Sequence, residues 1–299
     1  MAKLKTDRIC QSDILEYLKA YSDFSFELAV LKMLRESGLI CEHGGLYEDA
    51  VTKKFREFDV RAITEIQRRR VRLAIECKNV RENFPILISC VPRHEQESYH
   101  QVALVGEPDP SESFTASTFH QSRAKTISIR GEHSIYKQGE PVGKNTVQVG
   151  KVIDGTITSN DSELYEKWGQ CLSSAVDLVD QAYWDGDDDD EKQETYQSMV
   201  IPFVVVPNER LWVVMYDEDG KRVSDPESSN RCSCFIHKNY EMGTKMAGTR
   251  MWLSHVEIVT IDGMQSFVQR YLGSEEAIGQ LFPKEGIIAA LQRAAEANT

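Results

Sequence analysis

The stretch from Arg56 to Asn79 restricts the fold most. It contains two strand-like runs, REFDVRAITEI and VRLAIECKN, joined by QRRR. Side chains in a strand alternate between two faces, so the position of the turn decides which residues lie opposite each other. A turn centred on Gln67 and Arg68 places one apolar set on a single face, namely Phe58, Val60, Ala62 and Thr64 opposite Cys77, Ile75, Leu73 and Val71. The sequence therefore predicts a β-hairpin with one buried face.

The other face of this predicted hairpin carries charges. In the same register Asp59 lies opposite Glu76, with Cβ atoms roughly 4.5–5.5 Å apart. Two carboxylates this close repel each other unless a proton or a cation separates them. Lys78 follows two residues after Glu76, so its side chain points to the same face. Oxygen ligands in this arrangement suit Mg²⁺ or Mn²⁺, and we predict a metal site here.

A helical segment at residues 12–38 supplies a further carboxylate. A break is expected near Ser22–Ser25, with Ser25 as the N-cap of the second helix and Gly38 as its end. Glu27 falls close to the apolar stripe of that helix. A carboxylate set towards a core is unfavourable unless it is paired or bound to a metal. Glu27 is therefore a candidate third metal ligand.

A simpler interpretation treats the charged face as solvent-exposed. Cross-strand ion pairs would then join Glu57 to Lys78 and Glu65 to Arg70, a common arrangement on exposed strands. The register, the added Glu27 and the basic character of the hairpin favour the metal site over this alternative.

In this order along the chain, Glu27, Asp59, Glu76 and Lys78 resemble the PD-(D/E)xK, or restriction-endonuclease-like, superfamily of nucleases. The matching lines are FELAVLKMLRESGL, FREFDVRAIT and LAIECKN. The resemblance implies that Glu27, Asp59 and Glu76 bind Mg²⁺ (or Mn²⁺) and that Lys78 assists the attacking water. The motif covers residues 25–80.

This chain departs from the family pattern at one position, since Phe58 stands where the family has a proline before the aspartate. Some members also carry a glutamine near the site, on the helix that follows the hairpin. Gln170, in KWGQCLSSA, is the candidate for that accessory role, with an ordinary polar helix position as the alternative.

The resemblance implies hydrolysis of a phosphodiester bond. We expect a Mg²⁺-dependent DNA endonuclease, of a bacterial restriction or defence type, with RNA as the less favoured substrate. The alternative is a module on the same fold that has lost activity or depends on a regulatory partner or ligand, and that binds nucleic acid or protein. A homodimer is a family expectation for cutting both strands.

Basic residues are concentrated locally although the net charge is −12. Residues 53–72 hold eight basic and three acidic residues. The hairpin tip is expected to contact a nucleic-acid backbone through Arg68, Arg69 and Arg70. Lys125 and Arg130 mark a second expected phosphate-facing surface. The alternative for the tip is a solvated turn that happens to be rich in arginine.

The order of elements predicts an α/β fold with a central mixed β-sheet flanked by helices. Residues 1–217 are expected to form a restriction-endonuclease-like core with an insertion around 92–160, which we could not assign. Residues 218–299 are expected to be a C-terminal extension that packs on the core. A helix is predicted at 162–184 and another in the terminal GIIAALQRAAEA.

Three further features bear on chemistry and location. Cys232, Cys234 and His237 form C-x-C-x-x-H without a second ligand pair, which favours thiols on a strand over a zinc site. The acidic run Asp187–Glu191 is interpreted as a solvated loop, with calcium binding as the lesser alternative. No apolar run approaches the roughly 20 residues that cross a membrane, and scattered cysteines fit a cytoplasmic protein.

Overall fold

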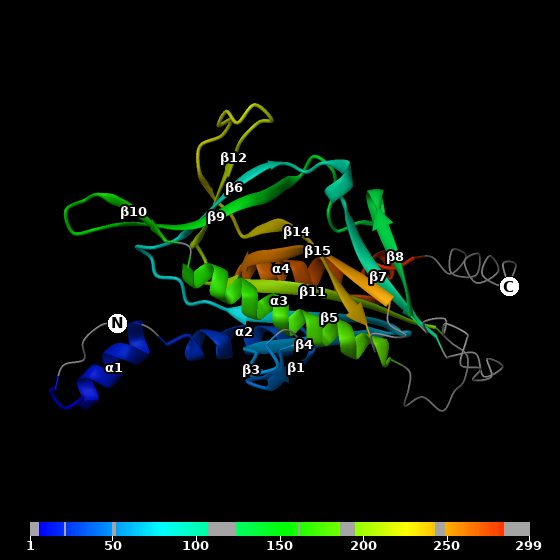
Figure 1. Cartoon of the computed structure of the whole chain (residues 1–299), viewed down its shortest axis with the longest axis horizontal. Coiled ribbons are helices and arrows are strands. Elements are labelled where there is room, and N and C mark those ends of the chain that lie inside the picture. Colours follow the sequence, from blue (N-terminus) through cyan, green and yellow to red (C-terminus); the bar gives the residue numbers. More distant parts are fainter. Residues whose placement is uncertain are drawn as a thin grey trace, which may run out of the picture.

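The computed structural model describes residues 6–20, 22–49, 52–106, 124–160, 162–185, 195–242 and 249–283. Over these residues the chain forms an α/β protein with a 13-stranded mixed β-sheet and five α-helices (Figure 1). The prediction of an α/β fold with a central mixed sheet is confirmed.

The helices are short except for one. They are α1 (Gln11–Ala20), α2 (Phe24–Glu36), α3 (Ser162–Tyr183), α4 (Ile261–Tyr271) and α5 (Glu275–Gln280), with 3₁₀ turns at Glu95–Glu97 and Gly131–His133. The first strands are β1 (Ile40–His43), β2 (Leu46–Glu48), β3 (Phe55–Glu57), β4 (Val60–Ile66), β5 (Arg69–Cys77), β6 (Ile86–Pro92), β7 (Tyr99–Val105) and β8 (Ala124–Arg130). The remaining strands are β9 (Pro141–Lys151), β10 (Ile157–Asn160), β11 (Tyr196–Val206), β12 (Leu211–Met215), β13 (Glu227–Ser228), β14 (Arg231–Met242) and β15 (Thr249–Thr260).

Strand β11 lies in the middle of the sheet and is buried at every position. It runs parallel to β5 on one side and to β15 on the other. The main path through the sheet is β1-β4-β5-β11-β15-β14-β9-β6-β12-β13, while β2 and β3 form a small separate sheet. Strands with both faces covered read as continuous apolar runs, which explains the sequence MVIPFVVV at this position.

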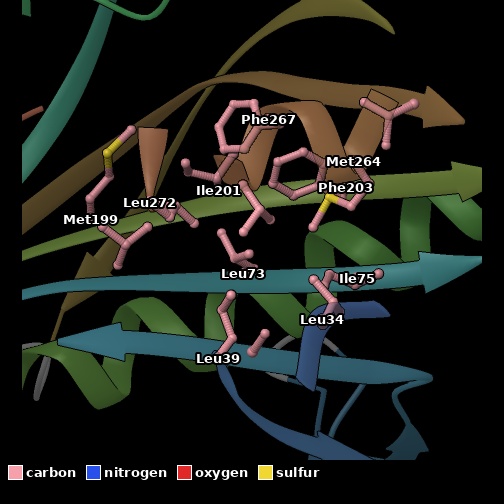
Figure 2. Close-up of a cluster of buried hydrophobic side chains, with 14 of the residues drawn as sticks. Leu34, Leu39, Leu73, Ile75, Met199, Ile201, Phe203, Met264, Phe267 and Leu272 are labelled. Atoms are coloured by element: carbon pink, nitrogen blue, oxygen red, sulfur yellow. The ribbon is translucent and has the colours of Figure 1, made fainter. Parts of the chain in front are cut away.

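One face of the central strands forms the largest hydrophobic cluster (Figure 2). Leu73 and Ile75 of β5 pack there beside Ile201 and Phe203 of β11. Phe267 of α4 meets Phe203 edge to face, with ring centroids 5.0 Å apart. Residues of α2 join the same cluster. Helices α2 and α4 therefore cover one side of the sheet.

Helix α3 covers the opposite side. Ala74 of β5 and Val200 of β11 pack against Ala175 and Val179 of α3. Because the side chains of β5 alternate, its even-numbered residues face α3. This alternation places Glu76, at the end of β5, on the same side of the sheet as α3.

The predicted register of the hairpin is confirmed over the ladder of β4 and β5. Val60 pairs with Ile75, Ala62 with Leu73 and Thr64 with Val71 in that ladder. Gln67 and Arg68 both have positive φ, 50° and 61°, as a two-residue type I′ turn requires. The predicted pair Glu65–Arg70 also forms, with Arg70 Nε donating to Glu65 Oε2 at 2.6 Å.

The first strand of the hairpin does not continue back through residue 57 as expected. Strand β3 turns aside and pairs with β2, so that Glu57 lies opposite Leu46. The expected cross-strand pairing of Glu57 with Lys78 is wrong for this reason. Asp59 is left in the short link between β3 and β4, at the end of the ladder.

The N-terminal prediction is right about the break and wrong about the cap. Helix α1 ends at Ala20 and α2 begins at Phe24, with Asp23 rather than Ser25 at the N-cap. The backbone N–H groups of Phe26 and Glu27 donate to the Asp23 carbonyl oxygen. Gly38 ends the helix with a φ of +86°, as predicted.

The segments that the sequence left unassigned or treated as an extension build much of the sheet. Residues 92–160 contribute β7, β8, β9 and β10, and the C-terminal part contributes β14 and β15, with β15 directly beside β11. The run Asp187–Glu191 and the segment GIIAALQRAAEA lie outside the described residues.

Cys232 and Cys234 are buried free thiols on β14, in line with the strand interpretation. His237 stands at a bulge of the same strand, where its Nδ1 lies 2.6 Å from the Tyr99 hydroxyl oxygen. In the described part of the chain, no helix is both long enough and apolar enough to span a membrane.

Replacing either of two helix glycines with alanine should change the stability of the protein, in opposite directions. A Cβ at Gly263 of α4 would lie 1.8 Å from the Asn230 carbonyl oxygen, whereas a Cβ at Gly169 of α3 would meet nothing within 4 Å. Gly263→Ala should therefore destabilise the protein by about 1–3 kcal/mol. Gly169→Ala should stabilise it by about 0.5–1 kcal/mol, because glycine loses more backbone entropy in a helix. Urea unfolding measures both, and a Gly263→Ala variant as stable as the wild type would contradict this packing.

Candidate functional site

The Asp59 carboxylate lies at the end of the β4–β5 ladder. Its Oδ2 accepts a hydrogen bond of 2.7 Å from the backbone N–H of Cys77, the last residue of β5. A charge-assisted bond of this kind is stronger than a neutral one and fixes the carboxylate beside the neighbouring strand. Asp59 is therefore held next to Glu76, as the hairpin register predicted.

Lys167 of α3 joins the two carboxylates. Its Nζ lies 2.8 Å from Asp59 Oδ2 and 3.2 Å from Glu76 Oε2. The predicted repulsion between two facing carboxylates is thus relieved by a cation, and that cation is a lysine from the helix covering this side of the sheet. The sequence reasoning did not single out Lys167.

Burial gives Glu76 unusual electrostatics. The residue has no exposed surface, and its Oε1 has no hydrogen-bond partner among the described residues. Burial, together with the negative charge of Asp59, raises the pKa of Glu76 to about 8. Burial acts to lower the pKa of Lys167, but Glu76 and Asp59 outweigh it and the pKa is raised. Lys167 therefore remains an ammonium at neutral pH.

Glu27 stands close to this pair from the other side of the sheet. It belongs to the first turn of α2, and its Oε2 lies 3.2 Å from His43 Nε2. Burial and the charge of Asp59 raise the pKa of Glu27. The buried Cys77 thiol has its pKa raised by desolvation first, and then by the charges of Asp59, Glu27 and Glu76. The three predicted carboxylates thus gather around the end of β5.

Lys78 takes a different place from the one expected. Its backbone N–H donates to the Val205 carbonyl oxygen at 2.9 Å, so the chain continues alongside β11. Its Nζ lies 3.8 Å from Asp23 Oδ2, at the N-cap of α2. The lysine that contacts Asp59 and Glu76 is Lys167, while Lys78 lies beside the helix that carries Glu27.

Gln170 lies one turn beyond Lys167 on α3. Its backbone carbonyl oxygen accepts a hydrogen bond of 3.3 Å from the Tyr47 hydroxyl. A signal for Lys167 was present in the sequence, because Leu164, Cys171 and Ser174 mark the buried stripe of α3. Lys167 falls on that stripe at helical spacing, and a lysine there requires a buried acidic partner.

The arginines predicted at the hairpin tip stand at the far end of β5. Arg69 is seven residues from Glu76, which corresponds to about 23 Å along a strand. Arg70 is held in ion pairs with Glu65 and Asp185. The Arg68 guanidinium lies over the Tyr196 ring, 5.4 Å from its centroid. The tip is therefore basic, but it lies away from the carboxylates.

Lys125 and Arg130 are both exposed on β8. Lys125 pairs with Leu104, at the same end of the sheet as the hairpin tip. Arg130 lies over the Tyr99 ring at 4.9 Å and donates to the Glu95 carbonyl oxygen. Figure 1 shows β8 at the opposite end of the molecule from the start of α3. The structure does not bring these residues beside Asp59 and Glu76.

Two of the predicted carboxylates, Asp59 and Glu76, form a donor set that fits Mg²⁺. Mg²⁺ is usually held by one or two carboxylates together with waters and substrate phosphates. Asp59 and Glu76 already flank one cationic group, and Glu76 Oε1 is a buried oxygen without a partner in the described part of the chain. Within the same residues no group of three His, Cys, Asp or Glu side chains is placed to hold a metal ion. The fitting pair is therefore Asp59 and Glu76, with Glu27 outside it in this arrangement.

Comparison of the chain with models of protein families, with curated proteins and with solved structures found no significant match.

The raised pKa of Glu76 should make stability depend on pH. The folded state keeps the Glu76 proton up to about pH 8, whereas the unfolded chain loses it near its ordinary pKa of 4.5. The folded state then binds more protons over this window, so stability falls as pH rises, by up to about 1.4 kcal/mol per pH unit. Glu76→Gln should remove this component and leave a shallower slope, since Glu27 contributes in the same direction.

Urea unfolding in EDTA between about pH 5 and pH 8 measures this difference in slope. Asp225→Asn, a change at a surface carboxylate with 88% side-chain exposure, is the control and should keep the wild-type slope. Equal slopes for the wild type and Glu76→Gln would show that Glu76 is ionised throughout this window.

Proposed function

We propose that this chain is a divalent-metal-dependent nuclease that hydrolyses phosphodiester bonds in DNA, with its centre at Asp59, Glu76 and Lys167. The observation that carries the proposal is the pair of carboxylates at the end of the β4–β5 hairpin, which share one ammonium while a buried Glu76 oxygen has no described partner. Such a pair supports the binding of a small, hard cation.

Within the α/β class, the order of the elements around the centre supports a restriction-endonuclease-like core. Helix α2 carries Glu27, the hairpin β4–β5 carries Asp59 and Glu76, and α3 then packs on the hairpin before β11 joins the sheet beside β5. This is the order that the resemblance in the sequence implies. The large insertion and the C-terminal strands are additions to such a core.

Hydrolysis needs water to form a bond to phosphorus while the bond to the leaving sugar oxygen breaks and that oxygen takes up a proton. A Mg²⁺ ion held by Asp59 and Glu76 would neutralise phosphate charge and favour deprotonation of water. Lys167, an ammonium at neutral pH, cannot act as the base. It can donate hydrogen bonds to water or to a phosphate oxygen, and so neutralise the charge that builds there.

Two lysines compete for the role that the resemblance assigns to Lys78. Lys78 keeps its place directly after Glu76 in sequence, and its ammonium lies near Asp23 of the α2 N-cap. Lys167 has the contacts with both carboxylates. We propose Lys167 as the lysine that acts at the phosphate, with Lys78 and Glu27 flanking the centre.

One observation favours a second candidate function, a nucleic-acid-binding or protein-binding module without catalysis. The Lys167 ammonium already neutralises the carboxylates, and a permanent ion pair of this kind would stabilise the fold without any metal. In that case neither Mg²⁺ nor Mn²⁺ would bind to the carboxylates, and no DNA would be cut.

Cleavage of plasmid and linear DNA in Mg²⁺ or Mn²⁺ separates these functions. Asp59→Asn and Glu76→Gln should each lower the rate by about 100-fold or more, since each removes charge from the metal-binding pair. Lys167→Met should lower the rate comparably and Lys78→Met much less. Lys32→Met, at a position with 75% side-chain exposure, is the matched control and should cut at the wild-type rate.

Thermal unfolding of each variant shows that a loss of cleavage is not a loss of fold. Cleavage that persists in both carboxylate variants, or in excess EDTA, would overturn the proposal. A folded wild-type protein that cuts neither DNA nor RNA in either metal would leave the binding module as the function.

A further inference from the structure

A polar cavity of about 270 Å³ lies between the turn that follows β5 and the hairpin of β9 and β10. Arg81 and Phe84 line it from the turn, and Gln148, Gly150 and Lys151 line it from the hairpin. Its size is near the lower end of the roughly 300–1,000 Å³ that small-ligand sites occupy. A single flat, polar group fits such a space better than a large ligand does.

The cavity is built by an aromatic ring lying against a glycine. A Cβ on Gly150 would lie 2.5 Å from the Phe84 ring, so only glycine lets the ring approach the strand this closely. Gln148 is two residues away on β9, and its side chain is therefore on the same face as the cavity. The ring and the amide are thus held in one arrangement by the backbone.

Gln148 supplies a buried acceptor without a described partner. The residue is 3% exposed, and its Nε2 donates to the Phe84 carbonyl oxygen at 3.2 Å. This bond fixes the orientation of the amide, because the reverse orientation would bring two acceptors together. Its Oε1 has no hydrogen-bond partner among the described residues. Buried polar atoms are almost always paired, so this oxygen indicates a donor from a bound molecule.

The charge of the cavity favours an anion. Lys151 is exposed at its wall, which Arg81 also lines. An aromatic ring, an amide acceptor and the Lys151 cation together match the parts of a nucleotide. Bases stack on aromatic rings and donate from their edges, while phosphates bind lysine and arginine.

Both segments that line the cavity lie close along the chain to the proposed catalytic centre. Arg81 follows three residues after Lys78, which limits the distance between their Cα atoms to about 11 Å. On the other side, β10 ends at Asn160 and α3 begins at Ser162, within two turns of Lys167. Figure 1 shows the β5–β6 connection, the β9–β10 hairpin and the start of α3 at the same end of the sheet.

We propose that this cavity binds one unstacked nucleotide of the DNA strand being cut, a few nucleotides from the bond at Asp59 and Glu76. The Phe84 ring stacks on the base, Gln148 Oε1 accepts from an amino or imino group on the base edge, and Lys151 binds an adjacent phosphate. The inference rests on the proposed function for its substrate class. It adds that the enzyme recognises bases as well as the backbone, and prefers single-stranded or locally opened DNA.

Binding in EDTA tests the cavity independently of cleavage. The probes are a fluorescein-labelled single-stranded deoxyoligonucleotide and an abasic strand of the same length, which keeps the phosphates but lacks the bases. The wild type should bind the strand with bases at least about tenfold more tightly, as expected for one stacked base. Phe84→Leu and Gln148→Met should lose most of this preference.

Lys151→Met should weaken binding to both strands and reduce the salt dependence of the affinity by about one phosphate contact. Lys32→Met is the matched control for the loss of one surface lysine and should keep the wild-type preference and salt dependence. The unfolding temperature of each variant confirms that the fold is retained.

Equal binding of the two strands by the wild type, or a preference unchanged in Phe84→Leu, would overturn the inference. If the wild type cuts DNA in Mg²⁺ while either of these results holds, the cavity inference fails and the proposed function stands. If the base preference depends on Phe84 but no metal supports cleavage, the cavity stands as a nucleotide site and the nuclease proposal fails.

Discussion

The need to neutralise buried negative charge at the end of β5 organises this part of the molecule. Asp59 accepts from the Cys77 backbone N–H, and Glu76 beside it has no exposed surface. Two such carboxyl groups are tolerated only when a proton or a cation relieves their repulsion. Lys167 fills that role and thereby fixes the start of α3 over the sheet. Any divalent cation at this position would have to displace or share the place of that ammonium.

On the side of the sheet that α3 covers, basic residues make structural ion pairs. A count of the basic residues in 53–72 therefore overstates the surface open to nucleic acid. Arg61 donates to Asp177 and Ser174 of α3. Arg72 is buried and donates to Asp185, just beyond α3. These cations hold the helix against the sheet, and losing one partner of such a buried pair costs about 3–5 kcal/mol. A basic sequence segment can therefore be structural over most of its length.

The local features of the site followed from the sequence because short-range rules determine them. The alternation of β4 and β5 gave the register, and hence the closeness of Asp59 and Glu76, while the stripe of α2 indicated Glu27. Lys167 was missed because it is 91 residues from Glu76 in sequence, and only tertiary packing brings the two together. The contact of Lys78 with Asp23 was not predicted because Lys78 lies just beyond Cys77, the last residue of β5, where strand alternation no longer fixes the direction of a side chain.

The α/β class and the central mixed sheet could be predicted from the sequence, but the number and order of the strands could not. The apolar run of β11 indicated a buried central strand, yet nothing local showed that β15 would lie beside it or that β14 would follow in the sheet. Ser25 was chosen as a cap by residue preference, whereas the chain uses the backbone of Asp23, two residues earlier. The β9–β10 hairpin, which carries the proposed nucleotide cavity, gave no motif to recognise.

A crystal structure of the wild-type protein soaked in Mn²⁺, with anomalous diffraction recorded, tests the central claim most directly. We expect one anomalous peak within coordination distance, about 2.2 Å, of both the Asp59 and Glu76 carboxylates, with the Lys167 ammonium moved off one or both of them. Under saturating Mn²⁺, a Lys167 ammonium that still bridges both carboxylates, with no peak beside them, would contradict the account and leave the centre as a structural ion pair.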